Sequence, residues 1–264
     1  MTSLRQALLL GESGVISLVG AGGKTSLMFR LAHELSMSGD SVLTTTTTKI
    51  FAPESGQSSC VLVSDSVSDL LGEAKGLIDE YRHLTMARAK LPEQGKLVGF
   101  APQTIDVIRG SRLFRWIIVE ADGAAGRPLK APEDHEPVVP ESTSIVVGLA
   151  GLSGVGQPLT DEWVFRSERF ADAAGVPHNT PVSETAVAKV FTHKNGIFQS
   201  TSAAASRLVF LNQADSPENR SAGRRIASLL TEDKRSGIRR VVVGQLQAES
   251  PVWKIFDPLA ATHP

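Results

Sequence analysis

Gly14-Val-Ile-Ser-Leu-Val-Gly-Ala-Gly-Gly-Lys-Thr-Ser26 runs from an apolar segment through a glycine-rich turn into a helical pattern. The apolar run 15–19 predicts a buried strand, and the spacing of apolar residues predicts a helix over 25–37. A strand, a glycine turn, Lys24-Thr25 and a helix, in this order, are typical of a loop that binds a phosphate chain. The lysine reaches the terminal phosphates, and the threonine hydroxyl can ligate Mg²⁺.

The match to the usual phosphate-loop pattern is incomplete, because Leu18 stands where that pattern has its first glycine. The shorter form Gly-x-x-Gly-Lys-Thr is present. An ordinary glycine turn with a surface lysine is the alternative, and the threonine directly after the lysine disfavours it. The nucleotide-binding residues predicted from this stretch are Gly20, Ala21, Gly22, Gly23, Lys24, Thr25 and Ser26.

The composition is that of an ordinary globular protein. The chain has 264 residues, 41% of them hydrophobic, and a net charge of −1, which argues against a nucleic-acid or membrane-surface protein. One cysteine, Cys60, excludes an internal disulfide, and no apolar stretch approaches the length of a membrane span. We therefore expect a cytoplasmic protein with no nucleic-acid or membrane partner.

Strand and helix patterns alternate along most of the chain. This alternation predicts one α/β domain over residues 1–264, with a mainly parallel, P-loop NTPase-like sheet flanked by helices. Segments 84–88 and 96–100 around a Pro-Glu-Gln-Gly turn predict a small β-hairpin insertion. Further helices are expected over 65–77, with Ser64 or Asp65 as the cap, and over 163–174, whereas the segment from Trp253 onward carries no clear pattern.

A second informative stretch runs from Arg115 to Pro132, where an apolar strand ends in Glu120-Ala-Asp122. Alternation along a strand places these two carboxylates on one side. Asp122 together with Thr25 is predicted to hold Mg²⁺, and Glu120 to position or deprotonate a nucleophile.

The glycine-containing turn that follows brings two cations to the same edge. Arg127 and Lys130 are predicted to bind a second, anionic substrate, with Lys130 counted among the catalytic residues. A surface turn with incidental ion pairs is the alternative.

Two more strand ends carry candidate ligands. Thr44-Thr-Thr-Thr-Thr-Lys49 follows a β-prone segment, and its last residues, Thr48 and Lys49, are predicted to face the site. Asn212-Gln-Ala-Asp215 resembles the base-reading element of GTP-binding proteins, with glutamine where lysine is usual. Asn212 and Asp215 are therefore predicted to contact the base, with guanine slightly favoured and ATP or GTP left open. An Asx turn is the alternative.

Four stretches taken together resemble the YqeC family: Gly20–Thr25, Thr44–Phe51, Val119–Lys130 and His135–Pro140. The resemblance covers nearly the whole chain, and its most specific part is the Glu-Ala-Asp-Gly…Gly-Arg-Pro-Leu-Lys block. It implies a P-loop nucleotide-binding fold and an accessory role in maturing selenium-dependent molybdenum hydroxylases. This chain has Phe165-Arg166 where the family usually has His-Arg.

The leading hypothesis is a Mg²⁺-dependent NTPase or phosphoryl-transfer enzyme in cofactor maturation, with Lys24 stabilising charge on the β- and γ-phosphates. One alternative is a nucleotide-regulated chaperone or carrier that delivers a cofactor to a client enzyme without transfer chemistry of its own. A fold that binds nucleotide weakly without turnover is a third.

Overall fold

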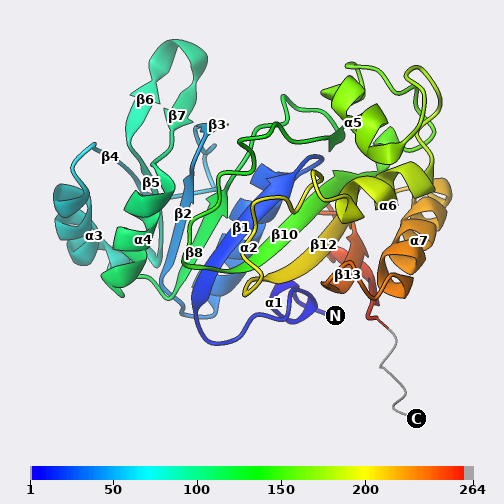
Figure 1. Cartoon of the computed structure of the whole chain (residues 1–264). Coiled ribbons are helices and arrows are strands. Elements are labelled where there is room, and N and C mark those ends of the chain that lie inside the picture. Colours follow the sequence, from blue (N-terminus) through cyan, green and yellow to red (C-terminus); the bar gives the residue numbers. More distant parts are fainter. Residues whose placement is uncertain (1, 259–264) are drawn as a thin grey trace.

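The structure is a computed structural model that describes residues 2–258. Its centre is a nine-stranded sheet in the order β14-β13-β12-β10-β1-β8-β2-β5-β4 (Figure 1). Neighbouring strands are parallel except β13 and β14. Its strands are β1 (Gly14–Gly20), β2 (Val42–Thr46), β4 (Val61–Val63), β5 (His83–Ala87), β8 (Trp116–Glu120), β10 (Thr143–Gly151), β12 (Ser206–Asn212), β13 (Ile238–Gly244) and β14 (Val252–Phe256).

Helices cover both faces of this sheet, which confirms the predicted mainly parallel α/β fold. The helices are α1 (Leu4–Ala7), α2 (Lys24–Met37), α3 (Val67–Tyr81), α4 (Pro102–Gly110), α5 (Ser167–Ala174), α6 (Glu184–Thr192) and α7 (Pro217–Glu232). Serines cap four of them: the side chains of Ser3, Ser66, Ser183 and Ser216 accept hydrogen bonds from backbone N–H groups of the first turn.

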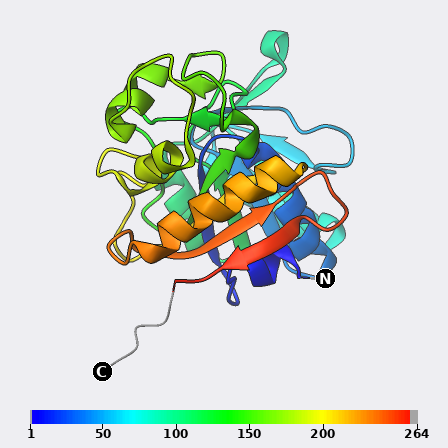
Figure 2. The same cartoon turned by 90° about the vertical axis from the view of Figure 1, so that its right-hand side faces the viewer.

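Side-chain alternation along β1 divides the core between the two faces. Ile16 and Leu18 pack with α1 and α2 on one face. Val15 and Val19 point to the other face, where α3 and α4 cover one half and α5, α6 and α7 cover the other half. Figure 2 shows α7 running alongside β13 and β14 at one edge of the sheet. Because all seven residues of β1 are buried, the strand reads as a continuous apolar run.

The glycine turn lies at the point of the sheet where the strand order reverses, so that the connections after neighbouring strands run to opposite sides of the sheet. β1 lies between β8 and β10, with β2 beyond β8 and β12 beyond β10. Ligands of open α/β sheets bind at such a switch point, outside the carboxyl ends of the strands. The turn after β1 therefore opens into a crevice flanked by the ends of β8, β10 and β12.

A separate three-stranded sheet stands beside the main one, in the order β3-β7-β6 (Figure 1). Its strands are β3 (Lys49–Phe51), β6 (Ala89–Leu91) and β7 (Lys96–Val98). The predicted hairpin exists, but its first strand was placed too early. Segment 84–87 belongs to β5 and pairs with β2 and β4, because its buried side chains fill the core.

Two local predictions were also wrong, and one strand lies in a segment without a clear sequence pattern. The cap of α3 is Ser66 rather than Ser64 or Asp65. The first residues of the predicted 163–174 helix form β11 (Val164–Phe165), which pairs with β9 (Leu129–Lys130), so α5 begins only at Ser167. The segment from Trp253 supplies most of β14, an edge strand that the sequence does not reveal. Within residues 2–258, no helix has the length and apolarity needed to cross a membrane.

The buried His83 predicts a pH-dependent stability. Burial lowers the pKa of its imidazole from 6.5 to about 4, and its ring bonds the Thr44 hydroxyl at 2.9 Å. The unfolded chain therefore binds a proton between these pH values that the folded chain does not. We expect the free energy of unfolding to include the whole contribution of the neutral His83 above pH 6.5. It should fall by about 3 kcal/mol as the pH drops towards 4.

Urea unfolding at pH 7.5, 5.5 and 4.5 measures this loss, and His83→Gln serves as the control because glutamine does not titrate. The wild-type chain should lose more stability than the variant across this range. Equal losses in both proteins would contradict a buried neutral imidazole.

Candidate functional site

The glycine turn between β1 and α2 is built for close backbone approach. Gly20, Gly22 and Gly23 have φ values of 93°, 79° and 131°, which side chains rarely adopt. A Cβ on Gly22 would lie 2.2 Å from the Gly151 nitrogen, so this position admits no side chain. No side chain caps α2 at Gly23, and the N–H groups of its first turn are left to face the crevice.

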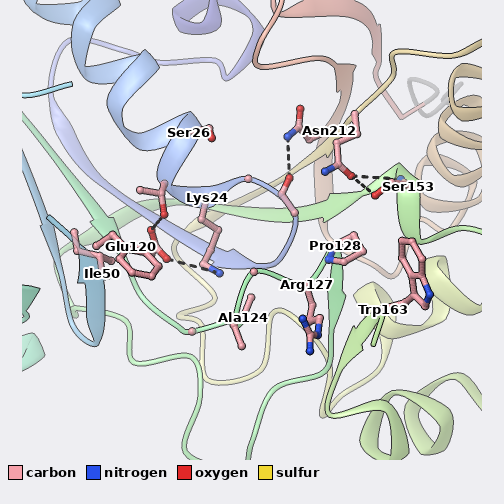
Figure 3. A pocket seen from close by; sticks show the side chains of 18 of the residues that line it. Lys24, Ser26, Ile50, Glu120, Ala124, Arg127, Pro128, Ser153, Trp163 and Asn212 are labelled. Atoms are coloured by element: carbon pink, nitrogen blue, oxygen red, sulfur yellow. Dashed lines mark hydrogen bonds and ion pairs between the residues drawn. The ribbon is translucent and has the colours of Figure 1, made fainter. Parts of the chain in front are cut away.

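Lys24 lies at the start of α2 with its ammonium among backbone and carboxylate oxygens. Lys24 Nζ donates to the Gly20 carbonyl at 2.5 Å and lies 3.2 Å from Asp122 Oδ1 and 4.0 Å from Glu120 Oε1. The two carboxylates thus flank one cation, as the alternation along β8 predicted. Figure 3 shows Lys24 and Glu120 pointing towards one another below α2.

The two carboxylates have different partners, and it is Glu120 that contacts Thr25. The Thr25 hydroxyl donates to Glu120 Oε2 at 2.7 Å, and Glu120 lines the cavity. Asp122 does not reach Thr25, because its Oδ2 accepts from the Gly20 N–H at 3.0 Å and lies 2.9 Å from Lys130 Nζ. Glu120, and not Asp122, is thus the carboxylate in contact with the threonine, and the Thr25–Asp122 metal pair stays a prediction.

Lys130 lies beside Asp122, with its ammonium turned into the interior of the protein. Its side chain is fully buried, and its ammonium bonds Asp122, Glu136 Oε2 at 2.8 Å and the Gly123 carbonyl at 2.7 Å. All three donors are used inside the protein, so Lys130 has none left for an anionic substrate. It is a buried counter-ion that neutralises two carboxylates.

The ion pairs continue from Lys130 towards the surface. Arg166 lies beside Glu136 at 2.5 Å and beside Glu133 at 3.0 Å, and Glu133 also pairs with Arg169. Charges of alternating sign thus connect the phosphate-loop lysine with α5.

The pKa values at the two ends of this network move in opposite directions. Burial raises the pKa of Glu120 above its usual range, although Lys24 and the Thr25 hydroxyl oppose the shift. Burial alone would also raise the pKa of Glu136, but hydrogen bonds and ion pairs with Arg166 and Lys130 lower it to about 2. Glu136 therefore stays ionised. In Glu120, by contrast, burial disfavours the ionised form of the carboxyl group.

A cavity of about 910 Å³ opens over these groups. Figure 3 shows it from close by, with Ile50 and Glu120 at one end and Asn212, Ser153 and Trp163 at the other. The lining residues are Gly22–Ser26, Lys49–Phe51, Lys96, Glu120, Gly123–Pro128, Ser153, Glu162, Trp163, Asn212, Gln213 and Gln247.

The other predicted residues divide between the cavity and the scaffold. Ser26, Lys49 and Arg127 line the cavity, and Arg127 Nε donates to the Asp161 carbonyl at 2.7 Å. Ala21 is buried, with its N–H donating to the Leu149 carbonyl, so it acts as part of the turn's framework. The Thr48 N–H donates to the Thr46 hydroxyl, and its side chain is not part of the lining.

Asn212 and Asp215 make different contacts: Asn212 bonds backbone groups that are distant in sequence, whereas Asp215 bonds the side chain of Asn219 on α7. Asn212 Nδ2 donates to the Gly22 carbonyl at 2.8 Å, and Asn212 Oδ1 accepts from the Leu246 N–H at 3.0 Å. The side chain thus ties the glycine turn to the loop after β13. Asp215 is exposed and accepts from Asn219 Nδ2 at 2.9 Å, outside the lining of the cavity.

Comparison with known proteins gives two agreeing results. The YqeC family profile, described as YqeC protein, matches residues 16–168. An Escherichia coli (strain K12) protein described as uncharacterized protein YqeC is 33% identical over 242 residues, which cover 92% of this chain and 91% of the relative. This chain belongs to the YqeC family. The segment matched by the YqeC profile contains the glycine turn, both carboxylates and Lys130, and it ends before Asn212.

Solved structures also resemble this YqeC protein, at low identity. They include the signal recognition particle 54 kDa protein of Aeropyrum pernix K1 in complex with GDP (TM-score 0.40, 16% identity), which aligns with 94% of this chain. Chloroplast FtsY of Physcomitrella patens (TM-score 0.43, 13% identity) aligns with 98% of it. The chain spans 45% and 66% of the lengths of these two proteins.

The buried position of Lys130 predicts a large stability effect. Lys130→Met should lower the free energy of unfolding by about 3 kcal/mol, because Asp122 and Glu136 would each lose a buried counter-ion. Arg169→Met is the matched control: this arginine pairs with the partly exposed Glu133 and the exposed Asp134, so its loss should cost about 1 kcal/mol or less.

Urea unfolding of Lys130→Met, Arg169→Met, Glu136→Gln and the double variant Lys130→Met/Glu136→Gln measures these differences. The double variant should cost less than the two single changes together, because each single change leaves a charge without its partner. A Lys130→Met protein as stable as Arg169→Met would contradict the buried network.

Proposed function

We propose that this protein binds a nucleoside triphosphate with Mg²⁺ at the turn after β1 and hydrolyses it or transfers its terminal phosphoryl group. The observation that carries the proposal is the contact between the Thr25 hydroxyl and Glu120, made beside Lys24 on the wall of the cavity. A hydroxyl, a carboxylate and a lysine around a backbone cradle are the groups that phosphoryl transfer requires.

The glycine turn fits a phosphate chain for two physical reasons. Its glycines leave no Cβ between the backbone and a ligand, and the uncapped start of α2 offers N–H donors together with the positive end of the helix dipole. The Lys24 ammonium can turn from Asp122 to a bound phosphate. Asp122 keeps its contacts with Lys130 and the Gly20 N–H when Lys24 moves away.

The oxygen donors at this site also fit Mg²⁺, and they do not fit a metal ion whose ligands all come from the protein. Residues 2–258 contain no group of three or more histidine, cysteine, aspartate or glutamate side chains that are placed to hold a metal ion together. Thr25 and Glu120 supply only two hard oxygen donors. Mg²⁺ takes one or two protein ligands and completes its shell with phosphate oxygens and water, so these two residues are enough.

In this arrangement Lys24 stabilises negative charge on the terminal phosphates, and Thr25 and Glu120 hold the metal directly or through water. Bound Mg²⁺ supplies neutralisation of the charge that develops on the phosphate oxygens. The N–H groups at the start of α2 and of Gly23 orient the phosphate chain. Catalysis here is mostly positioning and electrostatic stabilisation, which requires little covalent chemistry from the protein.

The first test of this proposal uses Lys24→Ala, with the exposed Lys75→Ala on α3 as the charge-matched control. Calorimetry with ATP, GTP and CTP in the presence of Mg²⁺, followed by product analysis, measures binding and turnover. Lys24→Ala should weaken nucleotide binding at least tenfold and abolish turnover, because a charge-assisted contact to phosphate is lost. Lys75→Ala should match the wild-type protein.

The stability of Lys24→Ala should change less than its activity, since Asp122 keeps two other partners. Undiminished Mg²⁺-dependent turnover by Lys24→Ala, in a preparation free of contaminating ATPases, would contradict the proposal. Tight nucleotide binding by the wild-type protein without any product would favour the chaperone or carrier alternative.

The end of the cavity near β12 and β13 is the proposed place of the base. Asn212 fixes the relative position of the glycine turn and the Leu246 loop, and Gln213 and Gln247 line the same end. If Asp215 exchanges its contact with Asn219 for guanine N–H groups, Asp215→Ala should remove a preference for GTP over ATP and leave ATP binding unchanged. Calorimetry on this variant with both nucleotides measures that preference, and a preference that survives the substitution would remove Asp215 from the base site.

The family resemblance supports one further part of the proposal, a role in maturing selenium-dependent molybdenum hydroxylases. A client enzyme of this class should bind the protein differently with and without nucleotide. Co-purification of such an enzyme with wild-type protein and with Lys24→Ala, in the presence of Mg²⁺ and nucleotide, tests this part separately from turnover.

A further inference from the structure

The cavity continues past the phosphate site onto the small sheet β3-β7-β6, and the proposed function does not use that part of its wall. Four residues of this sheet line the cavity: the buried Ile50, and three with exposed or partly exposed side chains, which are Lys49, Phe51 and Lys96. We propose that these three form the subsite of a second ligand, one that carries a phosphate or carboxylate on a flat unsaturated ring. This inference rests on the proposed function, because it takes the phosphate loop to be filled by nucleotide.

Strand geometry places the three side chains on one face. Lys49 and Phe51 are two residues apart on β3, and Phe51 pairs directly with Lys96 of the antiparallel strand β7. Ile50 and Leu97, which pair with each other and alternate with these residues along β3 and β7, belong to the opposite, buried face, and Ile50 also borders the cavity at the end near Glu120. The sheet therefore presents two cations and an aromatic ring together, anchored by buried neighbours.

Both lysines are without an anionic partner. Within residues 2–258, the Lys49 ammonium makes no ion pair or hydrogen bond, and Lys96 has a single contact, with its Nζ 5.1 Å from the centre of the Phe51 ring. The Phe51 side chain is 67% exposed. An ammonium attracts a phosphate or carboxylate as a point charge, and an aromatic ring stacks with a flat unsaturated ring.

The position of this subsite separates it from the nucleotide. Adjacent strands lie about 4.8 Å apart, so the ends of β12 and β2 lie roughly 10 Å to either side of β1. The proposed base lies on the β12 side, and β3 follows β2 on the opposite side. Thr25 and Glu120 lie between the two, so the terminal phosphate of the nucleotide would face the second ligand.

Binding of 1-naphthyl phosphate tests the subsite. The phosphate loop is first saturated with Mg²⁺ and a non-hydrolysable analogue of the best-bound nucleotide, and the naphthyl compound is then titrated by calorimetry. Lys49→Ser and Lys96→Ser should each weaken its binding about tenfold. Lys90→Ser is the matched control: Lys90 is on the same sheet but pairs with Leu97 on the opposite face, so its loss changes the net charge equally and should not matter.

The two parts of the ligand are tested separately. Phe51→Leu should weaken 1-naphthyl phosphate about fivefold, because leucine packs but does not stack. The same variant should leave inorganic phosphate binding unchanged, and neutral 1-naphthol should bind far more weakly than its phosphate. 1-Naphthoic acid distinguishes a carboxylate from a phosphate as the preferred anion.

Several results would overturn the subsite: no saturable binding of 1-naphthyl phosphate to the nucleotide-loaded wild-type protein, an equal loss in Lys90→Ser, or unchanged binding in both lysine variants. A parallel loss of nucleotide binding in Lys49→Ser and Lys96→Ser would assign the lysines to the nucleotide itself. If the wild-type protein binds no nucleotide, the proposed function fails. Lysine-dependent naphthyl phosphate binding in that protein would still support the subsite.

Discussion

The buried Asp122 carboxylate is the interaction on which the rest of the site depends. It holds the Gly20 N–H at the end of β1 and lies against two lysines, one from the start of α2 and one from β9. A buried charge is tolerated only when it is paired and hydrogen-bonded. The end of β1, the start of α2 and strand β9 must therefore meet at the two carboxylate oxygens of Asp122 before the glycine turn takes its shape.

This arrangement leaves the phosphate-loop lysine free to exchange partners. With Lys130 permanently beside it, Asp122 stays neutralised whether or not Lys24 contacts it. Glu120 differs, because burial raises its pKa and, within residues 2–258, the close polar partners of its side chain are Lys24 and the Thr25 hydroxyl. Two carboxylates that are two residues apart in the chain thus differ in their surroundings: Asp122 is part of the buried framework, whereas Glu120 borders the cavity.

Local patterns predicted the fold and the loop, whereas the roles of individual side chains needed the tertiary structure. The strand, glycine turn and helix around Lys24 are contiguous in sequence, so their geometry follows from local rules. Burial of Lys130 is decided by Glu136 and Gly123, whose positions relative to it spacing alone does not give. Phe51 and Lys96 were missed because they meet only when two distant strands pair, and no motif marks either one.

The strand order also has a consequence for the way in which the chain folds. β1 is flanked by β8 and β10, which lie about a hundred or more residues later in the sequence. Contacts over such separations form slowly, because a long loop must close first. During synthesis the glycine turn emerges among the first elements, yet its framework is completed only when Asn212 has left the ribosome. The glycine turn is thus among the earliest segments made, and its surrounding framework is among the last parts of the chain to be completed.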